Sequence, residues 1–204
     1  RRPGRIGSPS HLPTVLRPPG YYVYKPSIIE TMRLLKGRGS KISFDFASFD
    51  VIASQMEVFE KILDARLIDV LFCNEEEAMA FATRRKMANG ATPEKFAREM
   101  AAAFGVTMVV SQGPKGCVAA AMGAGNAVQL ASAPAASVTV VDTIGAGDHF
   151  SAGFLYALAH GATLETACRC GCIAGAAAVE VSGAQVDDQR MKDVVKRLHS
   201  LMAE

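Results

Sequence analysis

The chain has 204 residues, of which 50% are hydrophobic and 21% are charged, and its formal net charge is +2. This composition is typical of a globular domain; the small charge does not favour nucleic-acid binding, and no apolar run reaches the ~18 residues of a membrane span. The five cysteines are an odd number without the spacing of a secreted disulfide scaffold, so we expect a cytoplasmic protein.

Residues 1–26 differ in composition from the rest of the chain. They contain six of the nine prolines and several basic residues, with no acidic residue before Glu30, and the chain does not begin with Met. We expect a disordered Pro/Arg-rich leader here. The alternative is an organelle-targeting segment, but this proline density argues against the amphipathic helix that such a segment needs.

From residue 27 onward, the hydrophobic pattern alternates between helical and strand periodicity, and we expect one domain over residues 27–204. The predicted elements, in chain order, are a helix over 28–37, a strand over 41–46, a helix over 51–67, a strand over 68–73, a helix over 75–85, a helix from Thr92-Pro93 to 104, a strand over 106–111, a hairpin over 117–122 and 127–131, and helices over 164–181 and 188–202. Such alternation predicts a mostly parallel α/β sheet, with ligands at the carboxyl ends of its strands.

The most informative stretch runs from Val138 to Phe154. Its β-branched start predicts a strand over 138–141, Gly145-Ala146-Gly147 predicts a tight turn, and helical spacing follows. The first N–H groups of a helix lack internal partners and suit an anion such as phosphate. Asp148 would place a carboxylate beside that anion. The alternative is that Asp148 only complements the helix dipole and Asp142 only ends a strand.

Two other phosphate-binding motifs are excluded. No G-x-x-x-x-G-K-[ST] sequence is present, so there is no Walker loop. A dinucleotide fingerprint would require Gly or Ala at Phe150, and the acidic residue about 20 positions further on, Glu165, lies in a helical stretch.

Three further patterns stand on their own residues. Asn74-Glu-Glu-Glu77 follows a predicted strand and reads as a helix N-cap with an acidic first turn. Ser111-Gln-Gly113-Pro-Lys-Gly116 also follows a strand and reads as a turn. Cys168, Cys170 and Cys172 cannot converge on one metal if they lie in a helix, so we expect small buried residues there.

The string Asp142-Thr-Ile-Gly-Ala-Gly-Asp-His-Phe-Ser-Ala-Gly153 closely resembles the signature of the ribokinase/PfkB family of carbohydrate and nucleoside kinases. The resemblance implies a ribokinase-like three-layer α/β/α fold with a mostly parallel sheet. It also implies transfer of the γ-phosphate of ATP, with Mg²⁺, to a hydroxymethyl group of a sugar or nucleoside. Gly145, Ala146 and Gly147 would form the anion hole, and Asp148 would be the catalytic base.

The resemblance extends to the other motifs. It implies that Asn74 and Glu77 hold Mg²⁺ through water. It also implies contacts to the nucleotide, from Ser111, Gly113, Gly116, Cys172 and Gly183. Asp142, with carbonyl groups near Ile144 and Gly183, would host a monovalent cation such as K⁺. His149 departs from the usual family pattern, and we interpret it as a local variation on the helix surface.

The resemblance covers about residues 27–204, the carboxyl-terminal half to two-thirds of a family member. We therefore expect a fold truncated at the N-terminus, without the lid and first strands. Asp45-Phe-Ala-Ser-Phe49 favours the adenosine-kinase-like and fructokinase-like branches. We expect no nucleic-acid or membrane partner and allow for a homodimer. A non-catalytic nucleotide-binding or interaction fragment is the alternative function, followed by a regulatory pseudokinase.

Overall fold

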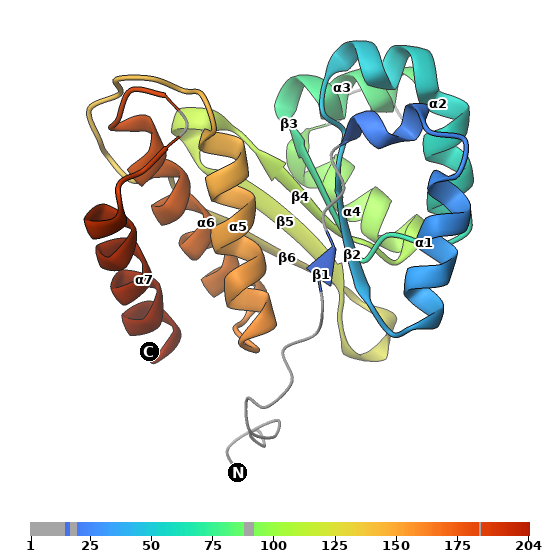
Figure 1. Ribbon diagram of the computed structural model, residues 1–204. Helices are drawn as coiled ribbons and strands as arrows, with labels where there is room; N and C mark the ends of the chain where they lie inside the picture. The colour runs from blue at the N-terminus through green and yellow to red at the C-terminus, as the bar shows by residue number, and fades with distance from the viewer. Residues whose placement is uncertain (1–14, 17–19, 88–91, 184) are drawn as a thin grey trace. The chain divides into compact units, whose positions relative to one another are not determined.

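The computed structural model describes residues 15–16, 20–87, 92–183 and 185–204. They belong to two compact units, one over residues 14–136 and the other over residues 137–204 (Figure 1). Most of the predicted leader lies outside the described residues. Its described part forms strand β1 (Val15–Leu16) and the 3₁₀ helix η1 (Gly20–Tyr24), in which Val23 is buried.

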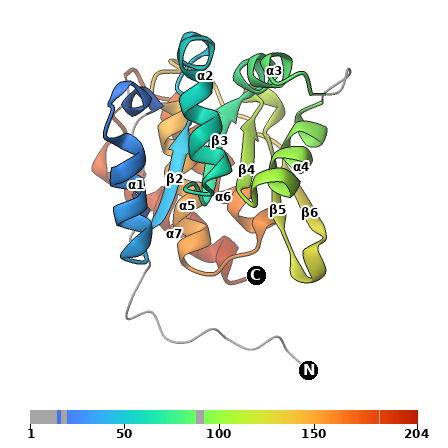
Figure 2. The same cartoon turned by 90° about the vertical axis from the view of Figure 1, so that its right-hand side faces the viewer.

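The described residues of the unit over 14–136 form a six-stranded sheet in the order β1-β2-β3-β4-β5-β6. Figure 2 shows β2 to β6. After β1 come β2 (Lys41–Asp45), β3 (Val70–Asn74), β4 (Thr107–Ser111), β5 (Cys117–Met122) and β6 (Val128–Ala133). The first four strands are parallel, and the last two form the predicted antiparallel hairpin. The predicted mostly parallel sheet is therefore confirmed.

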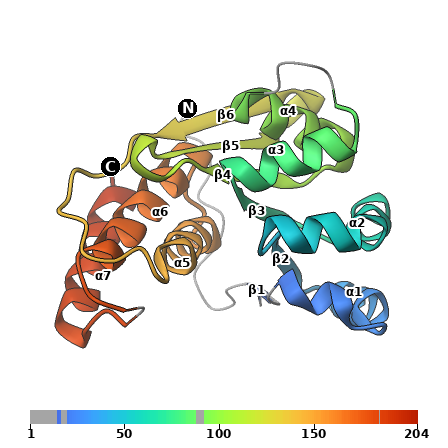
Figure 3. The same ribbon diagram turned by 90° about the horizontal axis from the view of Figure 1, so that it is seen from above.

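In the part of the chain that the structure describes, the parallel strands are connected by four helices: α1 (Ile28–Gly37), α2 (Phe49–Asp64), α3 (Glu75–Arg84) and α4 (Pro93–Phe104). Right-handed crossovers between neighbouring parallel strands put them all on one face of the sheet (Figure 3). Alternate strand residues such as Phe44, Leu71 and Met108 join the helices in one buried core. At its centre Phe46 stacks on Phe81, with ring centroids 4.9 Å apart.

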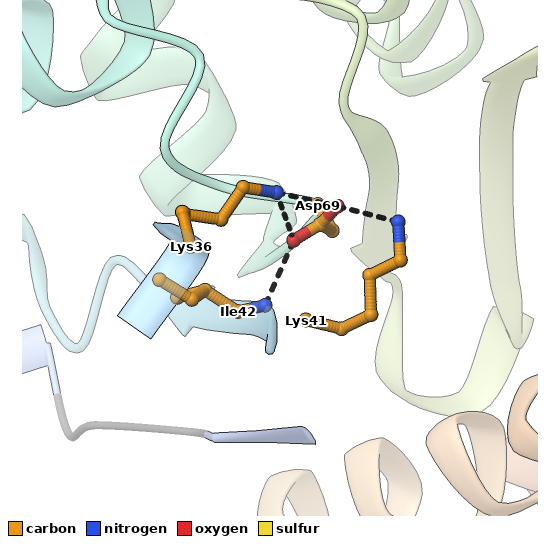
Figure 4. A network of polar contacts seen from close by, with 4 residues as sticks. All are labelled: Lys36, Lys41, Ile42 and Asp69. Atoms are coloured by element: carbon orange, nitrogen blue, oxygen red, sulfur yellow. Dashed lines mark hydrogen bonds and ion pairs between the residues drawn. The ribbon is translucent and has the colours of Figure 1, made fainter. Parts of the chain in front are cut away.

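A charged network joins the amino-terminal ends of β2 and β3 to α1 (Figure 4). Asp69 accepts hydrogen bonds from Lys36 Nζ at 2.8 and 2.9 Å, from Lys41 Nζ at 3.1 Å and from the Ile42 backbone N–H at 2.8 Å. Burial alone would raise the pKa of Asp69, but these donors outweigh it and hold the pKa below its usual value. Because ligands of such sheets gather at the opposite, carboxyl ends, we assign this network to stability.

The described residues of the unit over 137–204 form three helices, α5 (Ala146–Ala159), α6 (Leu164–Val179) and α7 (Asp188–Met202). Small residues let α5 and α6 pack closely. A Cβ atom added at Gly153 would lie 2.7 Å from both the Ala174 Cβ and the Cys170 carbonyl oxygen. One added at Gly171 would lie 2.8 Å from the Phe150 ring.

The predicted strand over 138–141 is wrong. These residues form no strand; Val140 and Val141 are 59% and 61% exposed. The backbone N–H groups of Val141 and Asp142 donate instead to the Val179 carbonyl at the end of α6, at 2.7 and 3.2 Å. A run of β-branched residues becomes a strand only where a second strand pairs with it, and this segment bonds to a helix end.

Within the described part of the chain, every helix is too short or too polar to cross a membrane.

Candidate functional site

The glycine turn at the start of α5 is formed as predicted, although residues 138–141 just before it form no strand. Gly145 is the N-cap residue and has a left-handed backbone with φ of +78°. The Ala146 N–H donates to the Thr143 carbonyl at 3.2 Å, so one of the three expected anion-hole groups takes part in the turn itself. Gly147 is exposed, with nothing within 4 Å of where a Cβ would lie. The helix therefore presents an open amino-terminal end, which favours anions.

Asp148 lies in the first turn of α5 and is exposed. This placement suits a carboxylate that complements the helix dipole, and it equally suits a base beside a bound phosphate. The position of Asp148 is therefore compatible with both roles.

Asp142 ties together two loops of the same unit. Its Oδ1 accepts the Ile144 N–H at 3.0 Å, and its Oδ2 accepts the Gly183 N–H at 2.9 Å. These bonds, with that of Ile144 the strongest, lower the pKa of Asp142. The carboxylate thus meets N–H donors, whereas the expected cation site pairs it with backbone carbonyls. A cation at Asp142 would share oxygens that already accept these two bonds.

The three cysteines lie in α6 and are buried, as the helical interpretation predicted. Cys172, one of the positions expected to contact the nucleotide, is 9% exposed. Gly183 has a positive φ of +78°, which the turn after α6 requires.

In the unit over 14–136, Asn74 and Glu77 form a capping box at the start of α3. Asn74 Oδ1 accepts the Glu77 N–H at 2.8 Å, and Glu77 Oε2 accepts the Asn74 N–H at 2.9 Å. This confirms Asn74 as the helix N-cap.

Glu77 is electrostatically unusual for a capping residue. It is only 7% exposed, and burial raises its pKa to about 7. The hydrogen bond from the Asn74 N–H opposes this shift, while the nearby charges of Asp45 and Glu76 add to it. A bound cation would relieve this concentration of negative charge.

The Ser111 loop lies beside Asn74 at the carboxyl ends of β3 and β4, where the two residues are register partners. Ser111 Oγ donates to the Cys73 carbonyl at 3.3 Å, and Lys115 Nζ lies 3.3 Å from the Glu75 carboxylate. The sheet thus brings together two motifs that are separate in the sequence.

Gly113 and Gly116 both have positive φ, of +53° and +101°. A Cβ at Gly116 would lie 2.0 Å from the Ala133 carbonyl oxygen. The close approach of β6 therefore requires glycine here, whether or not the loop also meets a nucleotide.

Sequence reasoning did not assign Asp45 to the site. It ends β2 as Asn74 ends β3, and it acts on the pKa values of both Glu77 and Cys73. The sequence feature that could have identified Asp45 is its position as the polar residue at the carboxyl end of a predicted strand.

Comparisons with known proteins agree with this architecture. Residues 23–190 match the family described as pfkB family carbohydrate kinase. A 1-phosphofructokinase of Haloferax volcanii is 41% identical in an alignment of 83 positions that covers 38% of this chain and 27% of that protein.

Solved structures extend the comparison. Adenosine kinase from Sinorhizobium meliloti superimposes with a TM-score of 0.76 at 21% identity, over 90% of this chain and 54% of that one. Fructokinase from Vibrio cholerae O395, in its fructose, ADP and calcium ion bound form, gives a TM-score of 0.67 at 25% identity, over 93% and 61%.

The chain thus spans between half and two thirds of the length of these structures, and its aligned segment spans about a quarter of the phosphofructokinase. The predicted ribokinase-like α/β fold is confirmed by the superpositions. The family match covers most of the chain and includes the Asn74, Ser111 and Gly145 motifs. This chain belongs to the pfkB family of carbohydrate kinases.

Proposed function

We propose that this chain carries the phosphate-transfer machinery of an ATP-dependent kinase that acts on a hydroxymethyl group of a sugar or nucleoside. The observation that carries the proposal is the left-handed Gly145 turn at the start of α5, with Asp148 in the first helical turn. It is supported by the names of the similar proteins, which are kinases of sugars, a sugar phosphate and a nucleoside.

In this proposal Asp148 accepts the proton of the acceptor hydroxyl as it attacks the phosphorus, a role worth typically about 10²–10⁴-fold in rate. The N–H groups at the start of α5 stabilise charge on the transferred phosphoryl group. Gly147 contributes such an N–H directly, while Gly145 and Ala146 shape the turn.

Asn74 and Glu77 are the residues proposed to hold Mg²⁺, through water. Mg²⁺ prefers oxygen ligands and keeps several of its waters, so two such side chains suffice. The raised pKa of Glu77 and the nearby charge of Asp45 support this assignment. When bound, the ion would neutralise charge on the phosphate oxygens.

In the unit over 14–136, Ser111, Gly113 and Gly116 are proposed to contact the nucleotide. In the unit over 137–204, Cys172 and Gly183 are also proposed as nucleotide contacts. Asp142 is proposed as a K⁺ site. The competing interpretation is that its carboxylate only accepts the two backbone N–H bonds that it already makes. A comparison of ATP binding in K⁺ and Na⁺ buffers tests that assignment.

The test of the proposal is calorimetric titration with Mg-ATP, together with a phosphate-transfer screen over fructose, ribose and adenosine. Binding with turnover supports the kinase. Binding without turnover supports the second candidate, a nucleotide-binding module in which Asp148 only complements the dipole of α5. A folded chain that shows neither overturns both.

A further inference from the structure

Two side chains on α5 bind the carbonyl groups of the glycine turn itself. His149 Nδ1 lies 3.0 Å from the Gly145 carbonyl oxygen, and Ser151 Oγ donates to the Gly147 carbonyl at 2.8 Å. Ser151 is buried, at 2% exposure, and His149 is half-buried. The proposed chemistry gives neither residue a role.

The first contact assigns the hydrogen on the imidazole ring. A carbonyl oxygen can only accept a hydrogen bond, so Nδ1 of His149 must carry the hydrogen. The same oxygen also accepts the backbone N–H of His149 at 3.0 Å. The ring therefore fills the second acceptor position of the Gly145 carbonyl.

These bonds control the N–H groups on the other side of the same peptide units. A trans peptide is rigid and planar, so the Gly145 carbonyl and the Ala146 N–H turn together, as do the Gly147 carbonyl and the Asp148 N–H. His149 thus fixes the direction of the Ala146 N–H, which closes the turn onto Thr143 through a long bond of 3.2 Å. Ser151 fixes the direction of the Asp148 N–H in the same way.

We propose that His149, assisted by Ser151, is a positioning residue that holds the glycine turn in its anion-binding conformation. The inference rests on the proposed function, because it concerns the same anion hole. It replaces our interpretation of His149 as a variation on the helix surface. The essential feature is a donor at the Nδ1 position, and the remainder of the ring is dispensable.

Two substitutions and a matched control isolate that donor. His149→Asn keeps an N–H donor close to the Nδ1 position, whereas His149→Leu removes it. His160 offers the control: its Nδ1 contacts the Tyr156 carbonyl at 2.8 Å, the same four-residue spacing at the other end of the same helix. His160→Leu therefore removes an equivalent contact away from the turn.

Hydrogen exchange of the Ala146 amide and calorimetric binding of ATP are measured on the whole chain and the three variants. A neutral hydrogen bond is worth up to about tenfold in an equilibrium, so His149→Leu should speed exchange at Ala146 and weaken ATP binding by up to about tenfold. His149→Asn should stay within about twofold of the parent chain, and His160→Leu should leave both quantities unchanged. Long-range ¹H–¹⁵N NMR should show the hydrogen of neutral His149 on Nδ1.

An Nε2–H tautomer, equal losses in the Asn and Leu variants, or an equal loss in His160→Leu would each overturn the inference. If the parent chain binds no ATP, the proposed function is wrong, and the part of the inference that concerns anion binding is wrong as well. Exchange at Ala146 and the tautomer would then still decide whether His149 holds the turn.

Discussion

At the scale of single residues, Asp148 separates catalysis from binding. Replacing it by Asn keeps the side chain's size but removes the base, so turnover should fall by at least the ~10²-fold that such a group contributes, while ATP binding stays nearly intact. Steady-state kinetics with the accepted substrate, beside calorimetry, measures both. Unchanged turnover in Asp148→Asn would leave only the helix-dipole role for this carboxylate.

The second prediction at this scale concerns the protonation of Glu77. Its pKa of about 7 leaves it half protonated near neutral pH. A cation bound through Glu77 favours the ionised form, so Mg-ATP binding at pH 7 should release roughly half a proton per site. Titrations in buffers of different ionisation enthalpy measure that number.

Glu77→Gln is the matched variant, because Gln also serves in a capping box. It should fold and abolish the proton release. Equal release from both chains would assign Glu77 to the helix cap alone.

At the scale of elements, the close pairing of α5 and α6 depends on Gly153. Gly153→Ala gains helix propensity but forces a Cβ to within 2.7 Å of the Cys170 carbonyl and the Ala174 methyl group. Overpacking of this kind costs about 1–3 kcal/mol, which outweighs the gain of up to about 1 kcal/mol from removing glycine, so chemical denaturation should show a net loss of stability.

Gly37, at the end of α1, provides the control for that substitution. Nothing lies within 4 Å of its missing Cβ, so Gly37→Ala should be neutral or stabilising. If Gly153→Ala behaves as Gly37→Ala does, the close approach of the two helices is wrong.

The elements also show what a sequence can predict. The helix over 188–202 has the predicted bounds, and Thr92 caps α4 with Pro93 at its first position, because caps and periodicity are local signals. The segment 138–141 was mispredicted because strand pairing depends on a distant partner. The candidate site shows the same difference between local and distant signals. The Gly145 turn could be predicted from neighbouring residues, whereas the effect of Asp45 on Glu77 depends on the pairing of two strands.

At the scale of the whole molecule, the proposed kinase residues divide between the two compact units. Asn74, Glu77 and Ser111 lie in one, and Asp142, Gly145 and Asp148 lie in the other. In the unit over 14–136, the register of β3 and β4 brings Asn74 and Ser111 together. In the unit over 137–204, the start of α5 positions Gly145 and Asp148.

Acid stability of the whole chain tests the network around Asp69. Its folded-state pKa lies below the unfolded value of ~3.9, so the unfolded chain binds more protons in acid. The carboxylate therefore stabilises the fold at pH values above ~3.9, and this contribution is lost as the pH falls through the lower, folded-state pKa. Asp69→Asn should lower the free energy of unfolding by about 1–2 kcal/mol at pH 7, a figure already reduced for the partial exposure of the carboxylate. The variant should also lose less stability than the parent chain as the pH falls.

Glu57→Gln serves as the control, because Glu57 also pairs with a lysine, Lys61, but its side chain is 81% exposed. An exposed pair adds little, so this variant should keep the parent's stability at pH 7. Urea unfolding at pH 7, 5, 4 and 3 measures all three chains. If Asp69→Asn matches the parent throughout, the bonds that link α1, β2 and β3 add nothing net, and the fold depends on its apolar core alone.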